Sequence, residues 1–309
     1  IVFNTFFFPE TNQEKYLSNT STELSDNEPS ITKEETKSDF QYLSNDTNIN
    51  YALKEKYGIF ANCAVGKETF HTIENEKLKI TFTNKGGRII SVVMKEHQTY
   101  DSLPLDIFAQ ANSNFNLQFT TGKTINTTDL FFIADQRTNS LSMKLISDNQ
   151  HQIEYIYTLS EDYIVDFDIN IVGMETLIPT SVNFMKLEWQ MKTPQTEKSK
   201  ENQDMYTGIQ YQYSTDNEVD YLSFSSTDED EIKSRLNWVA FKQQFFSAIF
   251  IAKEGFKKPT ILKSSKNEES KFVKDLYAQF EIDYKHKRDE RIGFQFYFGP
   301  NHYKTLKSY

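Results

Sequence analysis

Short segments in which apolar and polar side chains alternate run along most of this chain. The alternation is cleanest over 78–83, 115–119, 141–145 and 152–159, where every second side chain is apolar. A period of two predicts a strand with one buried and one solvated face. Short polar turns, such as 160–162, separate neighbouring segments. The pattern predicts a meander of antiparallel strands and an all-β fold.

The strand pattern continues toward the C-terminus. Further strands are predicted over 163–172, 184–191, 208–213, 221–225, 272–284 and 291–299. Two hairpins are expected, one joining 68–73 to 78–83 and one joining 272–284 to 291–299 across a charged tip at 285–290. The polar segments 193–204 and 227–231 are predicted to be surface loops.

Gly86 and Gly87 stand side by side between two predicted strands. Paired glycines permit the positive backbone φ that a turn requires. A phosphate-binding loop is the alternative, but the spacing lacks G-x-G-x-x-G and no helix pattern follows. The turn is therefore favoured.

The segment 237–251 combines two glutamines and a lysine with a nearly unbroken aromatic and β-branched run. It is predicted to be a buried strand preceded by a short polar connection. Largely buried side chains are expected at Trp238, Val239, Phe241, Phe245, Phe246, Ile249 and Ile251. Gln243 and Gln244 need hydrogen-bond partners if they lie inside.

The N-terminal part has a different composition. Residues 1–9 are apolar and aromatic, which suits either the outer end of a transmembrane helix, with aromatics at interface level, or a fragment of core strand. Residues 10–60 are mostly polar and are predicted to be a flexible linker, because they bury too little apolar surface to offset ordering entropy. No run of about 18 apolar residues occurs, so no whole transmembrane helix is predicted.

Composition excludes several kinds of partner. Acidic side chains exceed basic ones by 44 − 34 = 10, which disfavours nucleic acid and anionic lipid headgroups. The single cysteine, Cys63, excludes an internal disulfide and offers no metal cluster. Phe (26) and Tyr (17) are abundant while Gly (10) is scarce, a bias that favours strands.

Three motifs resemble one family. The phrase Trp238-Val239-Ala240-x-x-Gln243-Gln244-Phe245-Phe246-x-Ala248 resembles a segment near the end of the large periplasmic domain in the YidC family of bacterial membrane-protein insertases. The Gly86-Gly87 turn near the first strands, and the closing phrase Tyr297-Phe298-Gly299-Pro300, are similar to further elements of that family. The resemblance covers roughly 68–309, and 103–234 matches in strand rhythm alone. Aromatic-rich and Asn-rich composition fits a lineage of the Bacteroidetes kind.

The resemblance implies a fold and a role. The fold is a β-supersandwich similar to galactose mutarotase, over 61–300, with a C-terminal helix packed on one sheet. Residues 1–9 would end a membrane helix, and 301–309 would begin the connection to a membrane core that inserts client proteins. The domain would lie on the periplasmic side of the inner membrane and contact SecD, SecF and the Sec translocon. No catalytic, cofactor or metal residues are assigned.

A carbohydrate-binding or aldose-epimerase-like protein is the alternative. A mutarotase needs a His acid and a Glu base that converge on a sugar ring. The histidines His71, His97, His151, His286 and His302 lie outside any phrase of that kind and are interpreted as surface or partly packed side chains. Trp189 and Trp238 offer stacking faces for sugars, although aromatic residues at strand spacing are more often core. Cys63 is interpreted as a small buried residue rather than a nucleophile.

Overall fold

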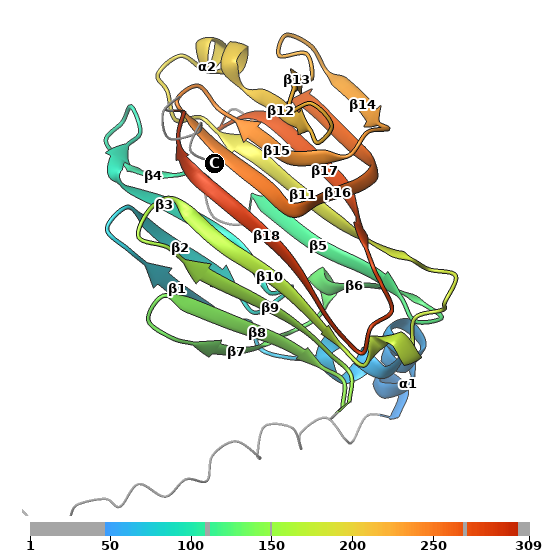
Figure 1. Ribbon diagram of the computed structural model, residues 1–309. Coiled ribbons are helices and arrows are strands. Elements are labelled where there is room, and N and C mark those ends of the chain that lie inside the picture. The colour runs from blue at the N-terminus through green and yellow to red at the C-terminus, as the bar shows by residue number, and fades with distance from the viewer. Residues whose placement is uncertain (1–46, 109–111, 149, 268–270, 302–309) are drawn as a thin grey trace, which may run out of the picture. The chain divides into compact units, whose positions relative to one another are not determined.

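The computed structural model describes residues 47–108, 112–148, 150–267 and 271–301 (Figure 1). The predicted end of a membrane helix at 1–9, and the segment 302–309 with His302, lie outside these residues. None of the helices in the described ranges is long and apolar enough to cross a bilayer.

Antiparallel strands make up most of the described chain, which confirms the all-β prediction. The strands, in chain order, are β1 (Phe70–Glu74), β2 (Leu78–Thr83), β3 (Arg88–Gln98), β4 (Pro104–Asp106), β5 (Ser113–Thr120), β6 (Thr124–Asn126), β7 (Ile133–Gln136), β8 (Ser140–Ile146), β9 (Gln152–Leu159), β10 (Ile164–Val172), β11 (Phe184–Pro194), β12 (Gly208–Tyr213), β13 (Val219–Tyr221), β14 (Asp228–Ile232), β15 (Leu236–Lys242), β16 (Phe246–Lys266), β17 (Phe272–Asp283) and β18 (Asp289–Pro300). The predicted β1–β2 hairpin is present, since the two strands pair antiparallel. The second predicted hairpin is wrong: β17 and β18 follow one another in the chain but do not pair, because β16 lies between them and bonds to both.

The N-terminal boundary differs from the prediction. Helix α1 (Thr47–Tyr57) and the 3₁₀ helix η2 (Gly58–Ala64) occupy the end of the supposed linker 10–60. Tyr57 is buried, and Phe60, with no exposed surface, packs edge-on against Phe119 of β5 at 5.5 Å. The linker prediction is therefore wrong from Thr47 onward. Helix α1 is mostly polar, and the partner of Phe60 lies on a strand far along the chain.

The predicted C-terminal helix is not found in the described part of the chain. Its α-helices are α1 and α2 (Lys200–Tyr206), and the described residues end just after β18. The main helical segment is N-terminal instead of C-terminal, and 302–309 lies outside the description.

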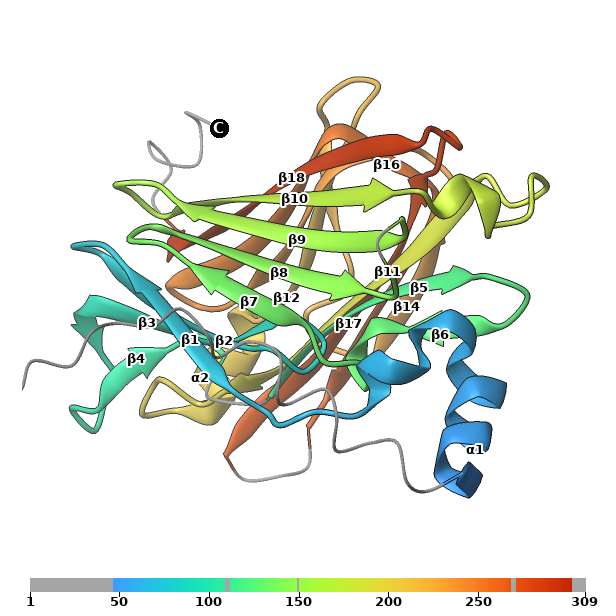
Figure 2. The same cartoon turned by 90° about the horizontal axis from the view of Figure 1, so that it is seen from below.

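The strands form a four-stranded sheet, in the order β1-β2-β3-β4, and a 14-stranded sheet. Strand β16 turns the large sheet into two layers because it changes partners along its length. Its first part pairs with β15 and β18, and its last part pairs with β14 and β17. Near the change, Gly255 takes a φ of +75°, which other residues rarely adopt. We call the sheet region around β10, β9 and β18 the β10 layer, and that around β5, β11 and β17 the β11 layer (Figures 1 and 2).

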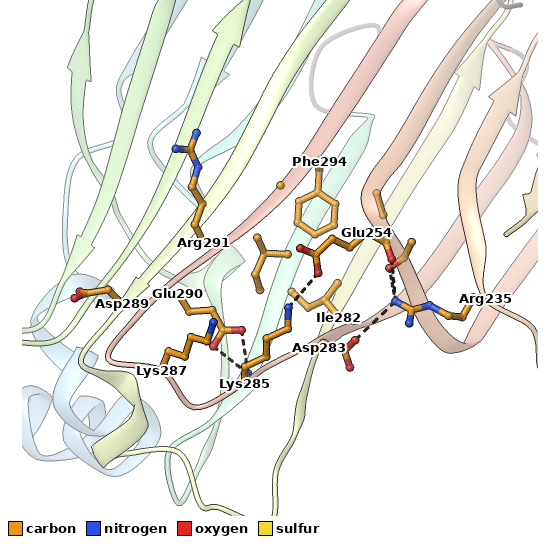
Figure 3. A pocket seen from close by; sticks show the side chains of 14 residues that line it. Arg235, Glu254, Ile282, Asp283, Lys285, Lys287, Asp289, Glu290, Arg291 and Phe294 are labelled. Carbon is orange, nitrogen blue, oxygen red and sulfur yellow. Dashed lines mark hydrogen bonds and ion pairs between the residues drawn. The ribbon is translucent and has the colours of Figure 1, made fainter.

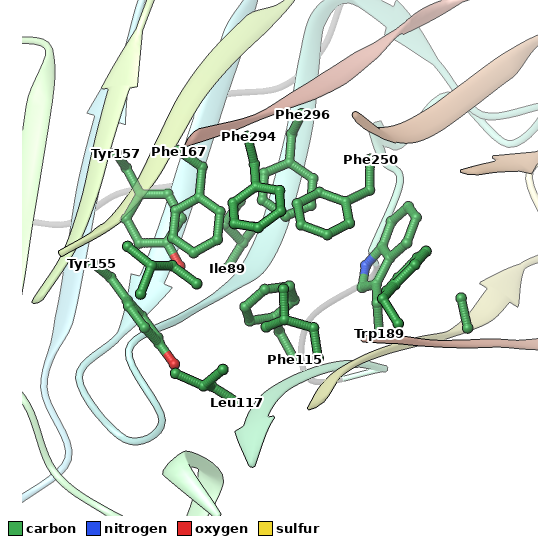
Figure 4. Packing of buried hydrophobic residues seen from close by; sticks show 14 of the residues in the cluster. Ile89, Phe115, Leu117, Tyr155, Tyr157, Phe167, Trp189, Phe250, Phe294 and Phe296 are labelled. Carbon is green, nitrogen blue, oxygen red and sulfur yellow. The ribbon is translucent and has the colours of Figure 1, made fainter. Parts of the chain in front are cut away.

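Aromatic rings fill the space between the two layers (Figure 4). Phe250 of β16 stacks on Phe296 of β18 at 4.6 Å, within the β10 layer. From the β11 layer, Phe115 meets Phe167 edge-on at 5.5 Å, and Trp189 lies 6.0 Å from Phe250. Such ring pairs stabilise a core by about 0.5–1.5 kcal/mol each beyond the burial of their area. The Phe and Tyr side chains that are abundant in the sequence therefore provide much of the packing between the two layers.

The small sheet is fastened to the β10 layer through the glycine turn. Gly86 and Gly87 have φ of +78° and +63°, which confirms the turn prediction. The hydroxyl of Tyr157 on β9 donates to the carbonyl of Gly87 at 2.8 Å. A Cβ on Gly87 would lie 3.0 Å from the ring of Tyr155 and 3.2 Å from that of Phe132. Both the backbone conformation and the close approach require glycine here.

Three loop or strand predictions need correction. The polar segment 193–204 is partly ordered, because β11 continues to Pro194 and α2 begins at Lys200. The acidic segment 227–231 forms most of β14, an edge strand on β16, where Lys263 pairs with Glu229 at 2.7 Å. The strand expected over 221–225 is β13, which ends at Tyr221. Charged side chains suit an edge strand that faces water, which a composition pattern cannot distinguish from a loop.

Candidate functional site

The segment 237–251 folds as a hairpin rather than as one strand. Strand β15 ends at Lys242 and β16 begins at Phe246, with the turn closed by a hydrogen bond from Gln243 N to Phe246 O at 2.8 Å. The sequence pattern did not predict this change of chain direction, because no Gly, Pro or Asn lies at the turn. We call 238–248, with its turn, the marker hairpin.

Burial along the hairpin follows the pleat of the two strands. Val239, Ala240, Phe241 and Ile249 are buried, whereas Trp238, Phe246 and Ile251 are half-buried. Phe245 is 52% exposed, so the prediction that it is buried is wrong. It lies in the turn between β15 and β16, outside both strands.

The two glutamines have orphan polar atoms. Gln243 is 2% exposed, yet its Nε2 has no hydrogen-bond partner among the described residues, and the same is true of Oε1 of Gln244. Their backbone is well held by Asn301, whose Nδ2 donates to Gln243 O at 2.8 Å and to Gln244 O at 3.3 Å. Asn301 Oδ1 accepts from Ser247 Oγ at 2.6 Å. The residue that follows β18 therefore fixes the marker hairpin.

The phrase Tyr297-Phe298-Gly299-Pro300 ends β18 beside the marker hairpin. The hydroxyl of Tyr297 donates to Pro300 O at 2.7 Å, so its ring folds back over Gly299. A Cβ on Gly299 would lie only 2.5 Å from that hydroxyl and 3.0 Å from the ring of Tyr163. The phrase aromatic-x-Gly-Pro thus requires glycine on packing grounds.

A charged pocket of about 180 Å³ opens where β16 leaves β18 for β17 (Figure 3). Its cations and anions balance: the first are Arg235, Lys285, Lys287 and Arg291, and the second are Glu254, Asp283, Asp289 and Glu290. Lys285 Nζ pairs with Glu254 at 3.0 Å, and this contact raises the pKa of the lysine. Lys285 N also donates to both oxygens of Glu290 at 2.9 Å. The charges therefore neutralise one another, which does not favour a charged ligand.

A polar groove of about 530 Å³ lies on the outer side of the β11 layer. Its lining includes Gln190, Lys263, Asp275 and Tyr277. The Tyr277 hydroxyl lies 3.1 Å from Glu188 Oε1, and burial together with that carboxylate raises the pKa of the phenol. The groove offers amide, hydroxyl and charged groups around one half-buried ring.

The candidate acid–base residues do not assemble. His151 bonds to Asp148 at 2.8 Å on the surface, and His97 lies 5.0 Å from the ring of Phe246. His71 contacts Thr69, and His286 contacts a backbone carbonyl; within the described ranges no contact joins two histidines. The same ranges hold no group of three His, Cys, Asp or Glu side chains suited to a metal ion.

The aromatic and thiol candidates lie in packed surroundings. Trp189 is 1% exposed and stacks on Phe241 at 3.9 Å, so its faces are not open to a sugar. Trp238 is half-buried beside β12. Cys63 is buried and its Sγ donates to Ile146 O; burial raises the pKa of the thiol to about 11, which disfavours nucleophilic use.

Comparison with known proteins connects this chain with one domain family. The family profile described as the YidC periplasmic domain matches residues 71–309. The membrane protein insertase YidC of Bacteroides fragilis is 36% identical over 251 residues, which cover 80% of this chain and 40% of that protein. The protein of the same name from Parabacteroides distasonis is 33% identical over 262 residues, covering 83% and 41%. This chain spans about two-fifths of the length of these relatives, which come from Bacteroidetes.

Solved structures with a similar course of strands are sugar enzymes or proteins named after them. A galactose mutarotase-like protein from Lactobacillus casei aligns with a TM-score of 0.49 at 10% identity, covering 74% of this chain and 100% of that one. A galactose mutarotase related enzyme from Lactobacillus acidophilus gives 0.48 at 13%, covering 74% and 97%. These scores and identities provide no basis for assigning a substrate or a reaction.

Proposed function

Because the chain belongs to the YidC periplasmic-domain family, we propose that it is an accessory, non-catalytic domain of a membrane protein insertase. It lies on the periplasmic side of the bacterial inner membrane. The family is not an enzyme family. The insertion groove and the contacts with client membrane proteins belong to the membrane part of the full-length protein.

The family match over 71–309 is the observation that carries this proposal. The structure supports a scaffold role in two ways. The space between the layers is filled by rings, and the charged pocket is lined by equal numbers of cationic and anionic side chains, with Lys285 paired to Glu254. The sandwich, which we take to be of the galactose mutarotase type, thus contributes shape and surfaces rather than reacting groups.

We further propose that the domain contacts the SecD and SecF subunits and steadies the insertase beside the Sec translocon. The test uses the full-length insertase in cells depleted of their own copy. One variant has residues 71–301 replaced by a Gly/Ser linker of equal length, and the intact protein is the control. Co-purification of SecD and SecF and protease protection of a newly inserted client are measured.

The expected result is loss of SecD and SecF from the linker variant, with client insertion reduced several-fold but not abolished. Unchanged co-purification refutes the partner assignment. Complete loss of insertion, with the variant at normal abundance, refutes an accessory role.

Carbohydrate binding is a second candidate, favoured by the polar groove beside Tyr277. Amide and carboxylate side chains around one ring are suited to hydroxyl groups. Mutarotation of galactose and glucose by the 309-residue chain, followed by polarimetry, should equal the buffer rate. A tenfold acceleration that Tyr277→Ala removes would support the sugar enzyme and contradict the accessory role.

A further inference from the structure

Several loops meet at the end of the sandwich where β18 finishes. Asn301 N donates to Phe245 O at 2.8 Å, which joins β18 to the marker hairpin. Lys242 Nζ donates to Tyr206 O at 3.1 Å, which joins that hairpin to α2. Tyr100 N, in the β3–β4 loop, donates to a carbonyl of the β11–α2 connection at 3.0 Å. We call this connected surface the exit end.

The exit end exposes large apolar side chains. Its members and their exposed fractions are Phe245 (52%), Tyr100 (54%), Leu103 (58%), Met205 (59%) and Tyr206 (47%). They make up five of the eleven large hydrophobic side chains exposed in the described part of the chain. Scattered apolar side chains are ordinary, but a group gathered at one end of a domain marks a contact surface.

The charged side chains around this patch indicate which kind of surface it can contact. The ionisable side chains on α2 and the loops around the patch are Asp101, Glu197, Lys198, Lys200, Glu201, Asp204 and Lys242. Positive and negative groups nearly balance, so anionic lipids gain little here. Tyr, Phe and Leu beside a few lysines are the residues that settle at the headgroup level of a bilayer.

We propose that the exit end rests on the headgroup region of the inner membrane, with Phe245, Leu103 and Tyr206 inserted among zwitterionic lipids. The inference rests on the proposed function, in which this domain is attached to a membrane-embedded protein. Strand β18 brings the chain to this end, since Asn301 is bonded to the turn that carries Phe245. The match covers 40% of the Bacteroides fragilis protein, so most of that relative lies outside it. In the proposed function that remainder includes the membrane part, and attachment to it holds the patch near lipid.

Attachment explains why a modest patch is enough. A tethered surface binds at the effective concentration that its connection sets, so weak individual contacts give a defined orientation. The exposed apolar side chains of the exit end would then be covered by lipid without a protein partner. Helix α1, at the far side of the molecule from the exit end in Figure 1, would face away from lipid.

The test places a fluorescent reporter at each end of the 309-residue chain. Met205→Cys lies within the patch, and Tyr51→Cys on α1, 69% exposed, is the matched control. Each variant is labelled at pH 7 with an NBD maleimide; buried Cys63 stays unlabelled. The chain is tethered by a C-terminal His tag to phosphatidylcholine vesicles that contain a nickel-chelating lipid. Doxyl-labelled lipids then report depth by quenching.

The expected result is at least threefold stronger quenching at position 205 than at position 51, insensitive to salt between 0.05 and 0.5 M. Adding Phe245→Ser and Leu103→Ser should lower the signal at 205 to that at 51. Both side chains are exposed, so the melting temperature should stay within a few degrees, which confirms folding. Equal quenching at the two sites, or stronger quenching at 51, overturns the proposal.

Two other occupants have distinct signatures. A second copy of the chain would sediment as a dimer that Phe245→Ser dissociates, and this result would replace the lipid assignment. A requirement for phosphatidylglycerol, abolished by salt, would show electrostatic binding and refute the zwitterionic interface. Because only lipid and this chain are present, failure of the SecD and SecF experiment leaves this measurement unaffected.

Discussion

Replacing Phe250 by Ala should be among the most damaging single changes in this domain. Phe250 has no exposed surface and lies on β16 between the layers (Figure 4). Its ring is 4.6 Å from Phe296, 5.0 Å from Phe294 and 5.5 Å from Phe280 on β17. The neighbours come from both layers, whose strands are fixed by hydrogen-bonded ladders, so the cavity cannot collapse.

The magnitude follows from the cavity. A buried Phe reduced to Ala costs about 3–5 kcal/mol, and the poor collapse of this site favours the upper half of that range. We therefore expect a loss of about 4–5 kcal/mol in the free energy of unfolding. At about 2–4 °C per kcal/mol for a domain of this size, the melting temperature falls by roughly 8–20 °C.

The control is Phe245→Ala in the turn just before β16. Phe245 is 52% exposed, so its truncation leaves no enclosed cavity and should cost no more than about 1 kcal/mol. Unfolding is followed by far-UV circular dichroism during heating and in urea. A loss below about 2 kcal/mol for Phe250→Ala, or equal losses for the two variants, would refute the assignment of Phe250 to the inter-layer core.

Gly87→Ala should destabilise the domain by about 2–3 kcal/mol, because the new methyl group meets two rings at a position where φ is positive. Gly122→Ala also has a positive φ, +78°, but nothing lies within 4 Å of its Cβ, so it should cost only about 1 kcal/mol. Equal melting temperatures for the two variants would contradict the close approach at the turn. Lys274, 1% exposed, pairs with Asp204 at 3.4 Å, and Lys274→Ala should cost about 3 kcal/mol or more because buried acceptors lose their donor. The control is Lys266→Ala, which removes an exposed lysine 3.6 Å from the same carboxylate and should cost less than about 1 kcal/mol. Similar urea midpoints for the two lysine variants would show that the buried pair is unimportant.

Local pattern was sufficient for most strands and for the glycine turn. Strand β9 begins and ends where the alternation over 152–159 predicts, because a half-buried strand records its environment in every second residue. The Gly86-Gly87 turn was equally readable, since few residues other than glycine accept its φ. The family resemblance, built on short phrases, is confirmed by a match over 71–309.

Long-range packing decided what the pattern missed. Helix α1 has little apolar surface of its own, and the burial of Phe60 in the following helix η2 depends on Phe119 of β5, far along the chain. The acidic strand β14 exists because β16 offers it an edge. The histidines illustrate the converse: the sequence supplied candidates, and the fold kept them apart.

The sequence by itself determined the β-rich class, the strand rhythm and the family, because each of these is stored in residues that are near one another in the chain. The tertiary structure alone decided that β16 passes from one layer to the other, that the run 237–251 reverses at Gln243, and that Phe245 faces solvent beside Asn301. The physical reason is that exposure depends on which distant strands end nearby, and no local period records where another strand ends.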